Sequence, residues 1–258
     1  MTPQPGLLTA ALRRIRPSAL LPLIGGNLLV FLAALLGLHI PDSHTWQLLL
    51  SLLLALGLIS GLLLWNASGI RRMRTVASQT PLWTGALLLG ACLLIAALLF
   101  HIAGYAEPNI ETRAGYWNSQ LSSGMRHLLS YERLVSLQQL ALAAFRWVFV
   151  PTLVLPFAME WATFGLHRIT IRRASRVVLS APHWVTAVVA LGITLWVVPW
   201  LTAWHPTHSV GGEMVSAVLR LGLAGLLVTA AAVLLLAVDA ELLHRKDPAT
   251  LGGGGVNR

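Results

Sequence analysis

The sequence WQLLLSLLLALGLISGLLLWNASGIRRMR occupies residues 46–74. Its first twenty residues, 46–65, contain no charged side chain, whereas Arg71, Arg72 and Arg74 follow within the next nine. A helix of twenty residues is about 30 Å long, which is the thickness of the hydrocarbon core of a bilayer. A charge-free stretch that ends in arginines is typical of a membrane-spanning helix whose basic end faces the cytoplasm.

The composition of the whole chain agrees with this interpretation. Of 258 residues, 56% are hydrophobic and 10% are charged, and the mean hydropathy is +0.73. Soluble domains contain about 25% charged residues, so the composition excludes a water-soluble protein. The single cysteine, Cys92, lies in an apolar stretch and excludes an intrachain disulfide.

Six apolar stretches are long enough to cross a bilayer. Their side chains are apolar on every face, whereas the strands of a membrane barrel alternate apolar and polar residues. The sequence therefore predicts an all-α fold, a polytopic bundle of six transmembrane helices. The predicted spans are residues 19–40, 46–65, 82–103, 140–166, 183–204 and 215–238.

The distribution of basic residues predicts the orientation of these spans. Thirteen of the 18 Lys and Arg residues fall on one side, which the positive-inside rule assigns to the cytoplasm, together with both termini. The outer side is neutral, so the formal net charge of +9 lies on the inner side. We therefore expect a multi-pass protein of a bacterial-type inner (plasma) membrane, with anionic lipids as partners at the cytoplasmic face and no nucleic acid.

The segments outside the spans are short. Residues 1–18 form a predicted cytoplasmic segment, residues 19–243 the transmembrane domain, and residues 244–258 a flexible cytoplasmic tail. The longest outer segment, residues 104–139, is expected to be irregular in its first half. From about Met125 it is expected to form one interfacial helix along the outer leaflet that runs unbroken into the fourth span.

Small residues recur inside three spans and predict close helix contacts. Packing within the bundle is the simpler interpretation, and dimerisation is the alternative. These residues are Gly57 and Gly61, Gly85 and Gly90, and Gly222 and Gly225.

Ionisable residues inside a span are costly and mark functional candidates. In the fourth span, Arg146 and Glu160 lie 14 residues apart, about 21 Å along a helix. Arg146 can extend outward, whereas the short side chain of Glu160 needs a partner, either His167 or an arginine of another inner loop. Pro151 and Pro156 lie between the two charges and each removes a backbone hydrogen bond.

This pattern suggests a gating element or a lined pathway. The alternative is a kinked structural helix with Glu160 at the level of the headgroups. A further candidate, Arg220, enters the sixth span from outside, where Glu213 or Glu107 are possible partners. Near the inner end, Glu241 and Arg245 have the spacing of an ion pair within one helix.

Six of the nine histidines fall at the outer side. Four of them, His39, His101, His205 and His208, form a candidate site for a divalent transition metal or for proton exchange. Hydrogen bonding to lipid headgroups is the alternative.

These observations favour a small transporter, a channel or a subunit of a membrane complex, with the fourth span as its functional element. One alternative is a membrane-embedded enzyme with a metal or acid–base site at the outer histidines. Another is a purely structural subunit of a larger complex. No catalytic residue or cofactor is predicted, because the sequence lacks a phosphate-binding loop, a zinc-protease motif and a cysteine pair.

Overall fold

The computed structural model describes residues 6–37, 39, 44–75, 77–203 and 210–245. Within these ranges the regular structure is helical, with no strand. Five helices are long and apolar enough to cross a membrane, which makes the chain an all-α protein compatible with multi-pass insertion. They are Pro17–Gly37, Thr45–Arg74, Leu82–Gln120, Tyr131–Phe164 and Val215–Arg245.

The remaining predicted span is residues 183–204, of which the described residues, 183–203, are also helical but do not form one of these five. It consists of α11 (Ala181–Gly192), the π-helical turn η4 (Ile193–Val197) and α12 (Val198–Ala203). Six spans with cytoplasmic termini therefore remain a prediction.

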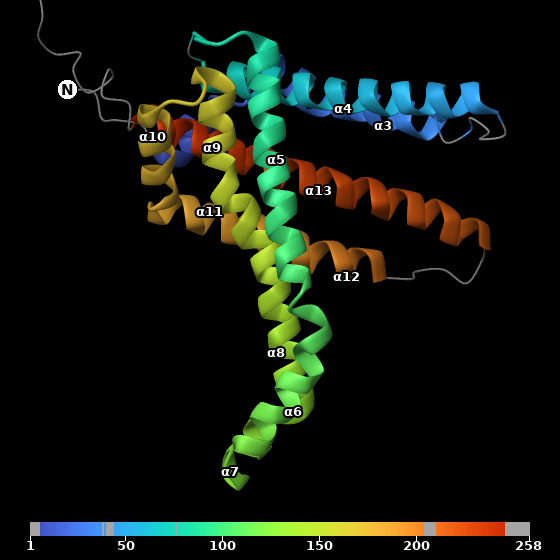
Figure 1. Cartoon of the computed structure of the whole chain (residues 1–258), viewed down its shortest axis with the longest axis vertical. Helices are drawn as coiled ribbons and strands as arrows, with labels where there is room; N and C mark the ends of the chain where they lie inside the picture. The colour runs from blue at the N-terminus through green and yellow to red at the C-terminus, as the bar shows by residue number, and fades with distance from the viewer. Residues whose placement is uncertain (1–5, 38, 40–43, 76, 204–209, 246–258) are drawn as a thin grey trace, which may run out of the picture. The chain divides into compact units, whose positions relative to one another are not determined.

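The chain divides into two compact units, residues 1–91 with 155–258 and residues 92–154. In the first unit α3 packs on α4, and α13 packs on α1, α11 and α12 (Figure 1). Besides α11, η4 and α12, the helical segments that lie wholly in this unit are α1 (Leu7–Leu12), α2 (Pro17–Leu20), η1 (Leu21–Gly26), α3 (Asn27–Gly37), α4 (Thr45–Arg74), α10 (Arg168–Val178) and α13 (Val210–Arg245).

Burial in the first unit is concentrated at the arginine-bearing ends of the helices. In α4 the buried residues are Gln47 near the start and five residues of the last two turns, whereas the apolar middle is exposed. In α13, residues 237–243 are all buried. The packed core therefore lies at one end of these helices, and their exposed apolar middles suit contact with lipid.

The inner arginines were expected in loops, but the structure places them in helices. Arg71, Arg72 and Arg74 form the end of α4, and Arg168–Arg176 belong to α10. Arginine is favourable in the last turn of a helix because its charge offsets the negative end of the helix dipole. Thr170 and Ala174 on α10 are buried while Arg168 and Arg172 are exposed, so α10 packs as an amphipathic helix.

Two of the prolines follow π-helical turns. The turn η3 (Phe145–Phe149) ends two residues before Pro151, which lies in the first turn of α9 (Val150–Phe164), whereas Pro156 lies inside α9. The turn η4 likewise precedes Pro199. A wider turn relieves the clash between a proline ring and the carbonyl four residues earlier.

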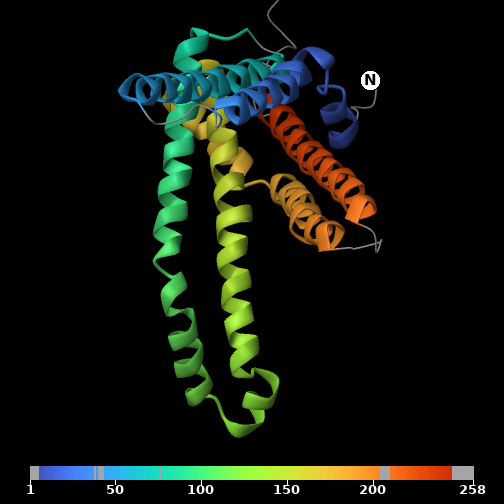
Figure 2. The same cartoon turned by 90° about the vertical axis from the view of Figure 1, so that its right-hand side faces the viewer.

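The second unit is a helical hairpin. After α5 (Leu82–Gly104), the elements are η2 (Glu107–Asn109), α6 (Ile110–Gln120), α7 (Ser123–Leu128) and α8 (Tyr131–Ala144). Helices α6 and α8 pack side by side, with α7 between them in the chain (Figure 2).

Two expectations for residues 104–139 were wrong. The first half is helical, because Pro108 occupies the first turn of η2 and Ile110 and Ala114 of α6 are buried. The second half is interrupted at Leu129 and Ser130, where the Ser130 hydroxyl accepts a hydrogen bond from the Arg133 amide at 3.4 Å and caps α8.

The glycines differ in how closely they are packed. A Cβ atom at Gly85 would collide with the backbone carbonyl of Ala162 and with Arg71, whereas one at Gly57 or Gly222 would meet no atom within 4 Å. Packing in the bundle therefore explains Gly85 and leaves Gly57, Gly222 and Gly225 unexplained.

We expect Gly85→Val to lower the free energy of unfolding by about 1–3 kcal/mol, because backbone atoms cannot yield to the added side chain. Detergent-denaturation curves of the purified protein measure this change. Gly57→Val is the control, since its side chain enters open space, and equal losses in the two variants would contradict the assignment.

Candidate functional site

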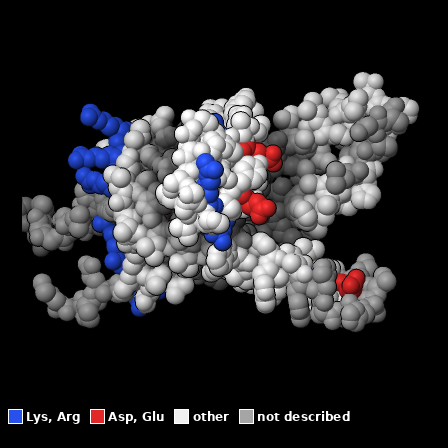
Figure 3. Space-filling model, turned by 90° about the horizontal axis from the view of Figure 1, so that it is seen from below, with Lys and Arg blue, Asp and Glu red and all other residues white. Residues whose placement is uncertain are grey.

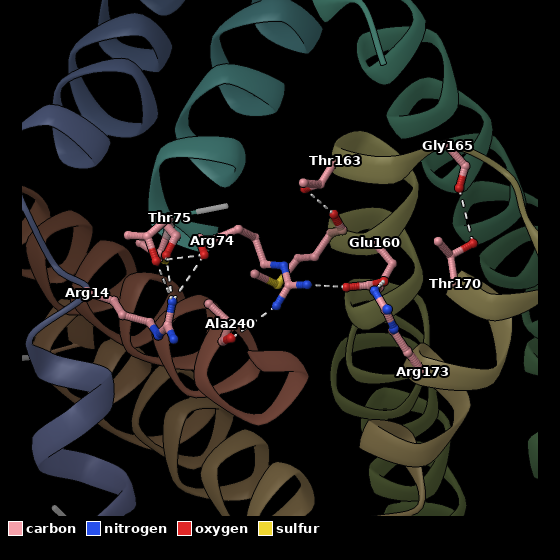
Figure 4. A network of polar contacts seen from close by, with 11 residues as sticks. Arg14, Arg74, Thr75, Glu160, Thr163, Gly165, Thr170, Arg173 and Ala240 are labelled. Atoms are coloured by element: carbon pink, nitrogen blue, oxygen red, sulfur yellow. Dashed lines mark hydrogen bonds and ion pairs between the residues drawn. The ribbon is translucent and has the colours of Figure 1, made fainter. Parts of the chain in front are cut away.

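A buried ion cluster joins α4, α9 and α10. The Arg74 Nη2 atom lies 2.5 Å from Oε1 of Glu160, and both side chains are fully buried. The Arg173 Nη1 atom lies 3.9 Å from Oε2 of the same carboxylate. Both guanidinium groups lie 5.6 Å from the centre of the Phe164 ring. We call Arg74, Glu160 and Arg173 the Glu160 cluster (Figure 4).

Local backbone geometry places these side chains. Gly165 has φ +84°, a conformation that favours glycine, and it ends α9 so that α10 turns back. The Thr170 hydroxyl donates to the Gly165 carbonyl at 3.1 Å and fixes this turn. At the end of α4, Thr75 has φ 54°, which is strained for a β-branched residue. Such strain is held by surrounding contacts and concentrates at functional sites.

Arg14 supplies those contacts at Thr75. Its Nη1 atom donates to the Thr75 hydroxyl at 3.0 Å and to the Arg74 carbonyl at 3.2 Å. Its Nε atom lies 2.7 Å from Oε2 of Glu241 on α13, and Oε1 of Glu241 lies 2.8 Å from Arg245. The expected Glu241–Arg245 pair is confirmed, and Arg14 completes it as a second partner.

Arg74 also connects the Glu160 cluster to α13. Its Nη1 atom donates to the Ala240 carbonyl at 3.2 Å. Figure 4 shows the Arg74 guanidinium between Ala240 and Glu160. One arginine thus links α4 to both α9 and α13.

A second buried pair joins α11 to α13. The Nδ1 atom of His183 lies 2.6 Å from Oδ1 of Asp239, and both side chains are fully buried. Asp239 precedes Ala240, so this pair and the Arg74 contact use the same turn of α13. Imidazole and carboxylate groups are the side chains that most often exchange protons inside membrane proteins.

The segment between α4 and α5 is held against the end of α9. Arg71 donates from Nε to the Ala162 carbonyl at 2.8 Å and from Nη2 to the Thr80 hydroxyl at 2.9 Å. The amide of Gln79 donates to the Thr163 carbonyl at 3.2 Å. These bonds satisfy the last carbonyls of α9 next to the Glu160 cluster.

The arrangement is suited to a conformational switch. Removing one partner of a buried ion pair costs about 3–5 kcal/mol, because the remaining charge is left without compensation. The packing of α4, α9, α10 and α13 at this end therefore depends on a few charges. A change that neutralises or displaces one of these charges would weaken the contacts among these helices.

The structure identifies the partner of Glu160. It is Arg74, with Arg173 nearby, which agrees with the expectation of an arginine from another inner segment. His167 instead begins α10, where its amide donates to the Thr170 hydroxyl at 3.1 Å. The functional roles of Glu160, Pro151 and Pro156 stay predictions.

Arg146 lies in the second unit, where its Nη2 atom is 3.0 Å from Oε2 of Glu107. The pair borders a cavity of about 600 Å³ that Glu111 and Gln139 also line. The Glu107 side chain is 62% exposed, so the pair is more open to solvent than the Glu160 cluster.

Within the described residues, Arg220 makes backbone contacts and not the expected ion pair. It donates to the carbonyls of Ser216 at 3.2 Å and Thr202 at 3.1 Å. Glu107, one of its expected partners, is paired with Arg146. The contacts of Arg220 connect α13 to α12, and its role in transport or gating stays a prediction.

Two of the four candidate histidines make local contacts. His39 Nδ1 lies 3.0 Å from the Leu35 carbonyl, and His101 Nε2 lies 3.1 Å from the Tyr105 hydroxyl. His205 and His208 lie outside the described residues. Within the part of the chain that the structure describes, no group of three or more His, Cys, Asp or Glu residues is arranged to hold a metal ion.

The His183–Asp239 pair and the role of Arg14 were not predicted. His183 was predicted only as the first residue of the fifth span, and Asp239 was not singled out. The sequence signal for this pair was Asp239 itself, because an acid between the apolar residues Val238 and Ala240 needs a polar partner when it is buried.

No family model, curated protein or solved structure matches the chain.

Proposed function

We propose that the protein is a small membrane transporter or channel that moves protons, alone or with a solute, and that the Glu160 cluster closes its inner end. The supporting observation is the complete burial of Arg74 and Glu160, two opposite charges from different apolar helices. Ionisable groups at such positions are costly, and they are retained where charges or protons move.

The proposal gives the two buried pairs separate roles. Glu160 on α9 pairs with arginines of α4 and α10, so the Glu160 cluster acts as a latch between these helices. His183 and Asp239 form a pair that can gain or lose a proton, so it acts as the proton-exchanging site. Ala240, next to Asp239, accepts a hydrogen bond from Arg74 and provides a physical link between them.

We further propose that residues 181–203 form a sixth span and that both termini are cytoplasmic, as in a bacterial-type inner membrane. Basic side chains gather along the left-hand edge of the face in Figure 3, the side on which α10 lies in Figure 1. This grouping supports the positive-inside assignment of the arginine-bearing helix ends. Reporter fusions after Arg74 and Arg176 should both report the cytoplasm.

Proton flux into liposomes loaded with a pH-sensitive dye tests the proposed function. Under a potassium-diffusion potential, the wild-type protein should acidify the lumen faster than protein-free liposomes do. In a transporter whose two ends open alternately, Glu160→Gln should abolish this flux while the protein remains inserted, because a protein whose inner end cannot close cannot complete the transport cycle. Glu107→Gln is the matched control, with the same chemical change at an exposed pair. Normal flux in Glu160→Gln would contradict the proposal.

A subunit of a larger membrane complex is the second candidate. The exposed middle of α4 and the open space at Gly57 and Gly222 favour it, because a neighbouring subunit would cover these surfaces. This candidate predicts comigration with another protein after gentle solubilisation and no proton flux from the purified chain.

A further inference from the structure

An apolar groove runs along α13 in the first unit. Two adjacent cavities of about 630 and 600 Å³ lie between α13 and the helical segments of the first span. Both are lined by Ile24, Gly225, Thr229 and Val233, so they form one continuous depression. We call it the α13 groove.

The walls of the α13 groove offer apolar surface and little else. Its polar side chains already have partners inside the protein, since Asn27 and Asn66 hydrogen-bond to each other at 2.8 Å and the Thr229 hydroxyl donates to the Gly225 carbonyl at 2.7 Å. A Cβ atom at Gly225 would meet no other atom within 4 Å, so the groove has room at its centre. An apolar, flexible chain fits such a surface.

One end of the α13 groove is bordered by positive charge. Leu12 and Ile15 line this end, and the neighbouring residues Arg13 and Arg16 are exposed. Unlike Arg14, these two arginines make no side-chain hydrogen bond or ion pair with the described residues. Basic pockets between membrane helices at the cytoplasmic side bind the headgroups of anionic lipids.

We propose that the α13 groove binds an acyl chain of an anionic phospholipid of the inner leaflet, with the lipid phosphate at Arg13 and Arg16. Apart from Leu12 and Ile15, the residues that line the groove belong to candidate membrane spans, so the groove opens toward hydrocarbon. A second copy of the chain in the same orientation would bring identical arginines to the same level, where like charges repel. A phospholipid instead supplies a negative group beside its apolar chains.

The proposal does not depend on transport, and lipid binding is measured without a flux assay. Native mass spectrometry of the purified protein with dioleoyl-phosphatidylglycerol or dioleoyl-phosphatidylcholine gives the affinity for each lipid. We expect one tightly held phosphatidylglycerol and weaker retention of phosphatidylcholine. Equal retention of the two lipids would overturn the proposal.

Two pairs of variants locate the site. Gly225→Phe should fill the α13 groove and abolish tight binding, whereas Gly222→Phe, which also enters open space on α13 but does not line the groove, should bind normally. Arg13→Gln and Arg16→Gln should each weaken phosphatidylglycerol binding about fivefold, as expected for about 1 kcal/mol per cation. Arg168→Gln and Arg172→Gln are the controls for general loss of charge.

Three results would reject this site. Equal binding by Gly225→Phe and Gly222→Phe would place the lipid elsewhere. Equal weakening by all four arginine variants would indicate nonspecific attraction to anionic lipid. A wild-type dimer that Gly225→Phe converts to a monomer would identify a second copy of the chain as the occupant.

Discussion

Glu160→Gln is expected to lower the free energy of unfolding by about 3–5 kcal/mol, because it removes the carboxylate that pairs with the fully buried Arg74 guanidinium. Arg173 cannot replace the lost charge, since it is itself positive. Unfolding curves in increasing concentrations of denaturing detergent measure the change. Glu107→Gln should lower the same free energy by no more than about 1 kcal/mol, since solvent screens that pair.

A double-mutant cycle separates the pair from its surroundings. Arg74→Met alone should be less destabilising than Glu160→Gln, because Arg173 stays 3.9 Å from Oε2 of the carboxylate. Arg74→Met combined with Glu160→Met should be more stable than Glu160→Gln alone, since the fully buried Arg74 charge is removed and the remaining Arg173 side chain is partly exposed. Strictly additive losses would show that Arg74 and Glu160 do not stabilise each other.

Asp239→Asn is expected to reduce proton flux at least tenfold while leaving the fold intact. Asparagine keeps the size of the side chain and a hydrogen bond to His183. Its amide cannot bind and release a proton as the carboxylate of Asp239 does. The liposome assay with the pH-sensitive dye measures the loss. Glu213→Gln, an exposed position on the same helix, is the control. Undiminished flux in Asp239→Asn would remove the pair from the proton pathway.

Much of the helical fold could be predicted from the sequence, because a helix that contacts lipid must be apolar over the thickness of the bilayer. A helix such as α4 must present apolar residues over the thickness of the bilayer, and residues 46–65 do so without interruption. The inner end of α4 was placed too early, at residue 65 rather than Arg74. Polar residues end an apolar pattern, but they do not end a helix whose last turns pack in a core.

The candidate site was only partly predictable. Glu160 stood out because a short acidic side chain in an apolar stretch needs a partner. Its pairing with Arg74 depends on how α4, α9, α10 and α13 pack together. In the sequence, Arg74 resembles every other arginine at the inner side. The His183–Asp239 pair links residues 56 positions apart, and each one alone looks like an ordinary polar residue at a membrane boundary.

The central claim is that the Glu160 cluster keeps the inner end of the first unit closed. Thr163 is fully buried beside the cluster, so Thr163→Cys in a Cys92→Ser background supplies a single reporter thiol. In inverted membrane vesicles this thiol should resist a membrane-impermeant maleimide, and it should react readily once Glu160→Gln is added. Equal labelling with and without Glu160→Gln would contradict the claim.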